Sequence, residues 1–178
     1  YSKENKISVF AMYMTALSIY INRIKGKNKI NVGTIILNRA DVKEKNTMGM
    51  FVTTAPVSME IDSNDNFLNF SKNVTKEMMA LMRHQSYPFD VLQEEVRKKF
   101  GIEDVLYDIV LSYQNAKFLD KNVNNEYRTR WCFAGYQTNS LTIHINDRDN
   151  DGKFIVDYDY LVDLFYDKEI EFIHNHIV

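Results

Sequence analysis

The segment His84-Gln85-Ser86-Tyr87-Pro88-Phe89-Asp90 gathers residue types that suit the positioning of a substrate. His84 and Tyr87 carry polar groups beside an apolar proline–phenylalanine pair, a mixture typical of the wall of a binding site. The same segment also suits a corner between two helices, because proline is favoured in the first turn of a helix. The residue types alone favour the helix corner for Pro88 and Phe89.

Residues 147–152, Asp-Arg-Asp-Asn-Asp-Gly, imitate the start of a calcium-binding EF-hand loop. Position twelve of such a loop needs a bidentate Glu, but it falls on Tyr158, and both flanks resemble strands. An acidic hairpin turn is therefore the favoured interpretation. His174 and His176 would point to different faces of a helix, and no further ligand completes a zinc site. His144 lies alone in a predicted strand, so we expect no metal site.

The sequence offers no established nucleophile motif. It contains no Gly-x-Ser-x-Gly elbow and no glycine-rich phosphate loop. Cys132, the single cysteine, lies between Trp131 and Phe133, and we expect it to be a packed thiol rather than a nucleophile. A single cysteine also excludes a disulfide within the chain and fits a reducing compartment.

Composition predicts a folded globular chain in which 45% of the 178 residues are hydrophobic and 13% are aromatic. The formal charge of −2 provides no field that would attract nucleic acid or an anionic membrane. The longest apolar stretch, residues 7–21, contains three polar residues and is shorter than the ~20 residues of a membrane span. With no secretion leader, we expect a cytoplasmic protein. We also expect it to bind neither nucleic acid nor a membrane.

Apolar periodicity and β-branched runs predict helices and strands without regular βα alternation, which favours an α+β domain with helices packed on a mixed sheet. The predicted helices cover residues 7–24, 67–83, 88–100 and 167–176. The predicted strands cover residues 30–37, 51–61, 106–113, 141–146 and 153–160. Residues 38–47 are expected to form a solvated loop, and Pro56 should lie on an edge strand or at a bulge.

Several segments together resemble the condensation domain of nonribosomal peptide synthetases. Residues 48–59 contain a Gly-hydrophobic-Phe-Val strand start followed by a proline, and residues 84–90 contain a His-Gln-x-Tyr-Pro-Phe-acid helix start. The similarity continues through residues 108–115 and on to Tyr158 and Leu164-Phe165. It therefore covers nearly the whole chain.

The resemblance implies an α+β layered fold, a mixed sheet with packed helices that forms one lobe of a chloramphenicol-acetyltransferase-like fold. In that fold two similar lobes form a V, and the active site lies at their junction. The family's catalytic His-His-x-x-x-Asp-Gly motif does not occur in residues 1–178. We therefore expect the C-terminal lobe alone, without the lobe that carries the catalytic histidine, and no activity from this chain by itself.

The resemblance further implies amide-bond formation between an acceptor aminoacyl thioester and a donor acyl or peptidyl thioester. Phosphopantetheine arms tether both to carrier proteins, so no cofactor is expected to bind this chain directly. The implied partners are peptidyl or acyl carrier domains, the N-terminal lobe and a neighbouring adenylation domain, with self-association through the exposed lobe interface. Two alternatives stay open: a coenzyme A-dependent acyltransferase of the same superfamily, and a non-catalytic module that docks carrier proteins.

The resemblance assigns supporting roles to several residues and a catalytic role to none. The residues expected to support the substrate tunnel are Thr53, Thr54, His84, Gln85, Tyr87, Ser112 and Gln114. Those expected to support the fold or the contact between lobes are Gly33, Arg39, Gly49, Pro88 and Phe89. Arginine suits a bidentate pair with a buried carboxylate, and the resemblance suggests the Asp of the absent motif as the partner of Arg39.

Three positions depart from the family pattern. Ile35 replaces the proline of a Gly-Thr-Pro stretch, Thr53 replaces an asparagine, and Ser58 replaces an arginine. The last two bear on acceptor specificity.

Overall fold

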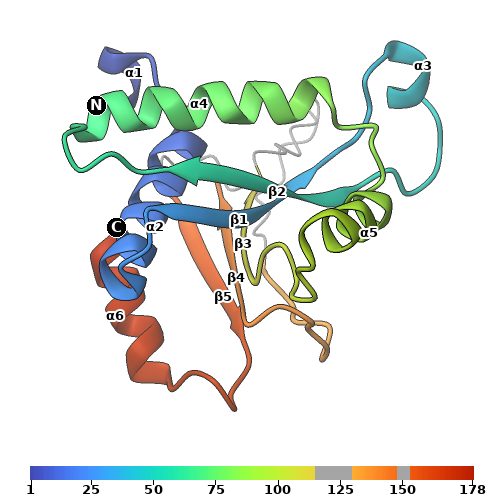
Figure 1. Cartoon of the computed structure of the whole chain (residues 1–178). Coiled ribbons are helices and arrows are strands. Elements are labelled where there is room, and N and C mark those ends of the chain that lie inside the picture. Colours follow the sequence, from blue (N-terminus) through green and yellow to red (C-terminus); the bar gives the residue numbers. More distant parts are fainter. Residues whose placement is uncertain (115–129, 148–152) are drawn as a thin grey trace, which may run out of the picture.

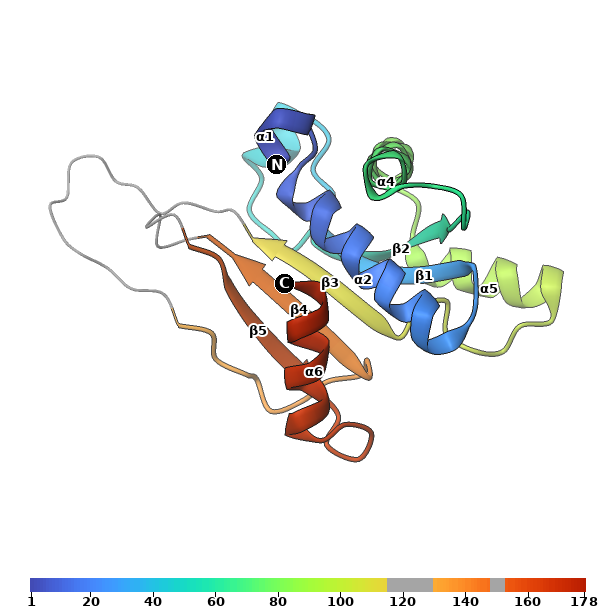
Figure 2. The ribbon, with the colours of Figure 1, turned by 90° about the vertical axis from the view of Figure 1, so that its left-hand side faces the viewer.

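In the computed structural model, five strands form a single sheet with helices on both sides (Figures 1 and 2), within the described residues 1–114, 130–147 and 153–178. The strands are β1 (Lys29–Ile36), β2 (Thr53–Glu60), β3 (Ile109–Gln114), β4 (Leu141–Asn146) and β5 (Ile155–Tyr160). The helices are α1 (Ser2–Asn5), α2 (Val9–Lys25), α3 (Val42–Lys45), α4 (Phe67–Arg83), α5 (Phe89–Phe100) and α6 (Asp167–Ile177).

The sheet is mixed, with the strand order β2-β1-β3-β4-β5. The central strand β3 runs parallel to both neighbours, whereas the outer pairs β1–β2 and β4–β5 are antiparallel. Helices α2, α4 and α6 pack together on one face, and α5 lies on the other side of the sheet beside β2 (Figure 1). The α+β layered architecture expected from the sequence is confirmed.

The hydrophobic core lies between the sheet and helices α2, α4 and α6. Side chains of α2 such as Met14 and Leu17 are almost fully buried against Val32, Leu111 and Ile143 from three adjacent strands. Helix α2 is apolar on most of its surface because the sheet and two further helices surround it.

Short local signals set the helix ends. The Ser8 side chain accepts a hydrogen bond from the Ala11 N–H at the start of α2, and Asn66 does the same for α4. Gly26 and Gly101 follow the last residues of α2 and α5 with φ angles of 61° and 64°. This left-handed conformation favours glycine because it carries no Cβ.

Pro56 lies on β2, an edge strand, where a missing N–H costs little, as expected. Residues 38–47 were expected to form only a loop, but they include the short helix α3. The prediction failed because an Asp41–Glu44 capping box satisfies the first amides of this helix. The predicted strand over 106–113 starts only at Ile109. Residues 148–152, which are all but the first residue of the EF-hand-like sequence, lie outside the described residues.

Candidate functional site

A pocket of about 380 Å³ lies between the start of β2, the end of α4 and the start of α5. Its lining residues are Thr53, Thr54, Ala55, Pro56, Leu81, His84, Gln85, Tyr87, Phe89, Leu92 and Glu95. The structure thus brings together five of the seven side chains for which a role in the substrate tunnel was expected, along with Phe89. The pocket is the candidate functional site.

A tight turn between α4 and α5 presents the polar side chains of this site. The His84 N–H donates to the Leu81 carbonyl at 2.9 Å, and the Tyr87 N–H donates to the His84 carbonyl at 3.0 Å. Pro88 then starts α5 with φ −64°, and its carbonyl accepts from the Leu92 N–H. The motif is therefore a helix corner, and this corner also holds His84 and Tyr87 at the pocket.

The pocket has a polar rim and an apolar interior. A hydrogen bond to the Glu95 carboxylate raises the pKa of Tyr87, so the phenol stays protonated and acts as a donor. Leu81, Phe89 and Leu92 provide the apolar part. Such a surface can orient a substrate, but no lining nucleophile is paired with a base. Sequence reasoning missed Glu95, although its spacing from Leu92 places both on one face of α5.

Gly33 supports this pocket through Tyr107. A Cβ built on Gly33 would lie 2.5 Å from Cδ2 of Tyr107, so only glycine allows the ring to lie against β1. The Tyr107 ring packs in turn against Phe89, with ring centroids 5.2 Å apart. Burial raises the pKa of Tyr107, and a hydrogen bond with Thr54 opposes that shift. Gly33 thus leaves room for the Tyr107 ring, and the role in the fold or the lobe contact that the resemblance implied for it stays a prediction.

Arg39 closes the loop that leads into β2. Its guanidinium donates to the main-chain oxygens of Glu44, Thr47 and Gly49, the last two both at 2.7 Å. Gly49 has a φ of 148°, a conformation that other residues rarely adopt. Arg39 thus has partners within its own loop, and its pairing across lobes stays a hypothesis.

Ser112 and Gln114 lie away from the pocket, on the central strand β3. The Gln114 side-chain amide donates to the Ser112 hydroxyl at 3.5 Å, and Ser112 is almost fully buried. These two side chains share the polar face of the sheet with His144 and Asn146, their register partners on β4. The structure therefore separates them from the other expected tunnel residues.

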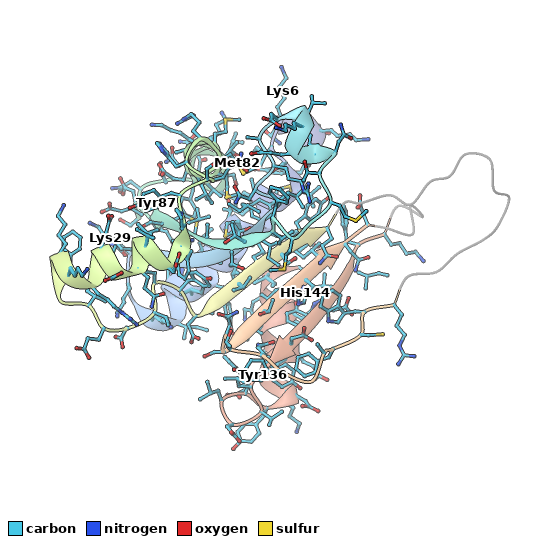
Figure 3. All side chains as sticks on the ribbon, turned by 90° about the vertical axis from the view of Figure 1, so that its right-hand side faces the viewer. Lys6, Lys29, Met82, Tyr87, Tyr136 and His144 are labelled. Carbon is cyan, nitrogen blue, oxygen red and sulfur yellow. The ribbon has the colours of Figure 1, made fainter. Side chains whose placement is uncertain are left out.

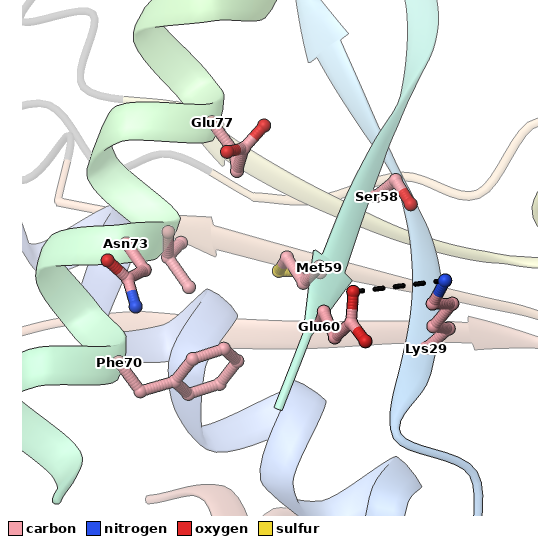
Figure 4. Close-up of a pocket in the computed structure, with 8 residues that line it drawn as sticks. Lys29, Ser58, Met59, Glu60, Phe70, Asn73 and Glu77 are labelled. Atoms are coloured by element: carbon pink, nitrogen blue, oxygen red, sulfur yellow. Dashed lines mark ion pairs between the residues drawn. The ribbon is translucent and has the colours of Figure 1, made fainter. Parts of the chain in front are cut away.

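A second pocket, of about 390 Å³, lies between β2 and α4 (Figure 4). Met59 and Phe70 form its base, and Glu77 and an exposed Lys29–Glu60 ion pair lie at its mouth. None of the residues singled out from the sequence as tunnel or inter-lobe residues lines it. An isolated exposed ion pair contributes little to binding or stability, so this pocket is not the candidate site.

The described part of the chain also bears on the predictions about the cysteine, metal sites and membrane spans. Cys132 is exposed, so the prediction of a packed thiol was wrong. Its neighbour Trp131 instead turns inward and donates to Asp159. Among the described residues, no group of three His, Cys, Asp or Glu side chains is arranged to hold a metal, and no helix could span a bilayer.

The layered fold matches that of condensation domains of known structure. The condensation domain from Monacolin K polyketide synthase MokA superposes with a TM-score of 0.82 at 16% identity, over 99% of this chain and 41% of that one. A four-domain nonribosomal peptide synthetase bound to AMP and glycine gives a TM-score of 0.79 at 19% identity, over 99% of this chain and 14% of that one. At these identities the likeness establishes the fold.

The chain belongs to the condensation domain family, whose model matches residues 1–178. It is 34% identical to surfactin synthase subunit 1 of Bacillus subtilis (strain 168) across all 178 residues, which are 5% of that protein. It is 26% identical to gramicidin S synthase 2 of Brevibacillus brevis, over 98% of this chain and 4% of that protein. The chain therefore spans a small part of the synthetases that it matches.

Proposed function

We propose that this chain is the C-terminal lobe of a nonribosomal peptide synthetase condensation domain and shares in amide-bond formation between two carrier-bound thioesters. The family match over residues 1–178 carries this proposal. Coverage supports the assignment to one lobe, because nearly all of the chain aligns with only 41% of the MokA condensation domain. The catalytic motif would then belong to the remainder of the domain.

The proposed reaction transfers an acyl group without any change in oxidation state. The amine nitrogen of the acceptor aminoacyl group attacks the carbonyl carbon of the donor thioester. A carbon–nitrogen bond forms, the carbon–sulfur bond breaks, and the proton lost by nitrogen balances the thiol released. Phosphopantetheine arms of the partner carrier proteins present both thioesters, so this chain binds no cofactor of its own.

The pocket at His84 would position a substrate or a substrate-bearing segment rather than move a proton. Within the described residues His84 is exposed, and no salt bridge joins it to an acidic side chain. The rim of Tyr87, Glu95 and Thr54 provides hydrogen-bonding groups around an apolar interior, which suits orientation.

The test compares this chain with the full-length protein that contains it, using carrier proteins loaded with donor and acceptor groups. Mass spectrometry should detect dipeptidyl product from the full-length protein and none above the buffer control from this chain. Product from the isolated chain would contradict the proposal. Product formed by the full-length protein from acyl-coenzyme A and a free amine, without carriers, would favour the coenzyme A enzyme instead.

A further inference from the structure

The outer strands of the sheet bury a polar face opposite the hydrophobic core. Leu141, Ile143 and Ile145 of β4 belong to the core. Because side chains alternate along a strand, His144 and Asn146 point to the other side, and both are more than nine-tenths buried. Figure 3 looks onto this side of the sheet and shows His144 there, well separated from Tyr87.

Asp159 of β5 connects the sheet to the segment of residues 130–140. Its carboxylate accepts a hydrogen bond from Nε1 of Trp131, with N···O distances of 3.1 and 3.3 Å, and lies 3.1 Å from Nε2 of His144. The Trp131 and His144 rings stack with centroids 3.9 Å apart. The side-chain amide of Gln137 donates to the main-chain oxygen of Asp159 at 2.9 Å. One aspartate thus holds two side chains of this segment.

Two acidic side chains of β5 face His144. Asp157 lies directly opposite His144 in the β4–β5 register, and Asp159 lies on the diagonal. Ser112, its register partner on β3, and Trp131 of the covering segment are both uncharged. Buried charges need partners, so two carboxylates around one imidazole favour the protonated ring.

We propose that Trp131, His144 and Asp159 form a proton-sensitive clasp that fastens residues 130–140 to the outer strands. When His144 is protonated, Nε2–H donates to Asp159 and the positive ring attracts both carboxylates and the indole face. When the proton is lost, the attraction between two opposite charges disappears, and the Asp159 carboxylate is held only by hydrogen bonds from uncharged donors. The clasp is therefore tight at low pH and loosens as pH rises through the deprotonation of His144.

The chain carries its own reporter of this clasp, because Trp131 is its single tryptophan. A protonated imidazole stacked on an indole quenches its fluorescence. Between about pH 5.5 and about pH 8.5, where histidine changes charge, Trp131 emission and its accessibility to acrylamide should rise in one step. His144→Gln should abolish the step. Asp159→Asn should move its midpoint down by at least about one pH unit, because an attracting charge is lost.

Asp163→Asn is the matched control, since it removes an exposed carboxylate just beyond β5 and should leave the midpoint unchanged. The proposal is overturned if wild-type emission and accessibility do not change with pH, if the step survives in His144→Gln, or if Asp159→Asn leaves the midpoint in place. If either variant fails to fold, proton NMR of the wild-type chain decides. One imidazole shifted upfield by the indole ring must titrate at the fluorescence midpoint, and its absence would overturn the clasp.

Discussion

The guanidinium carbon of Arg39 lies 4.1 Å from the centroid of the Phe51 ring. Phe51 immediately precedes Val52 and the start of β2, so this cation–π contact ties the two ends of one loop together. Together with its three hydrogen bonds to main-chain oxygens, it makes Arg39 the organising residue of the loop that delivers Thr53 to the pocket.

Arg39→Ala should therefore lower the stability of this chain by itself. Because the side chain is only half-buried, we expect a loss of about 1–2 kcal/mol in the free energy of unfolding, measured by urea denaturation. Arg39→Lys, which keeps the charge but loses the planar fork, should recover only part of it. If the urea midpoint of Arg39→Ala equalled that of the wild type, the loop contacts would be unimportant for stability. That result would favour a role for Arg39 only in contact with the other lobe.

Gly33→Ala should be destabilising because the new methyl group would meet the Tyr107 ring. Overpacking of this kind costs about 1–3 kcal/mol. Tyr107→Leu should relieve the clash, so the double variant should show a coupling of at least about 0.5 kcal/mol. Urea denaturation is measured for the wild type, the two single variants and the double variant. If the two single losses in stability simply added, contact with Tyr107 would not explain why position 33 requires glycine.

His84→Ala in the full-length protein should slow amide formation by roughly ten- to a hundredfold, the usual scale for lost positioning. Ser86→Ala is the matched control, because Ser86 belongs to the same turn but does not line the pocket. Both variants are measured with the same loaded carriers. The comparison is with replacement of the second histidine of the His-His-x-x-x-Asp-Gly motif that we propose for the remainder of the domain. A larger loss in His84→Ala would place the essential base in this chain.

The loop that Arg39 organises carries apolar side chains in solvent, including Met48 at 98% and Met50 at 93% exposure. Exposed apolar groups of this kind mark an interface, so the isolated chain should bind a hydrophobic dye and self-associate at micromolar concentration. Replacing both residues with Gln should weaken both effects. Met79→Gln, on the exposed side of α4, serves as control. If the wild type, the double variant and Met79→Gln all sedimented alike, the surface around Met48 and Met50 would not be the site of self-association.

Burial strongly raises the pKa of Tyr158, whose hydroxyl lies 3.0 Å from Nδ1 of His174. Above about pH 10 the unfolded chain releases this proton while the folded chain retains it. Stability from this group is therefore complete below about pH 10 and falls as pH rises further. Tyr158→Phe should reduce the alkaline loss in urea denaturation. A loss of the same size in the variant would exclude Tyr158 as its source.

Local sequence signals predicted the elements well because each depends on nearby residues. Asn66 and Gly101 set helix ends through contacts within four residues, and the strands follow from β-branched runs. The helix α3 was missed because its capping box lies in a charged stretch that resembles an ordinary loop. The start of β3 was placed too early because Asp108 binds the Ser140 amide instead of continuing the strand.

The site was only partly predictable because it depends on contacts between distant segments. The motif residues at 84–90 and the threonines after Phe51 could be chosen by resemblance, and they do meet in one pocket. No spacing along the chain indicated that Tyr107 would cover Gly33. Similarly, His144 gained a partner only when β5 placed Asp159 beside it.

The strand order also determines when each part of the sheet can form during synthesis. The antiparallel pairs β1–β2 and β4–β5 join strands that are consecutive in the chain. The other edge of β1 can pair only after β3 has been synthesised, since Gly33 pairs with Val110. A growing chain therefore carries the first hairpin with one edge of β1 unpaired until β3 emerges. Loop closure over this distance is slow compared with hairpin formation. The arrival of β3 is the step that joins the two halves, and until then the newborn chain is most exposed to pairing with the wrong strand.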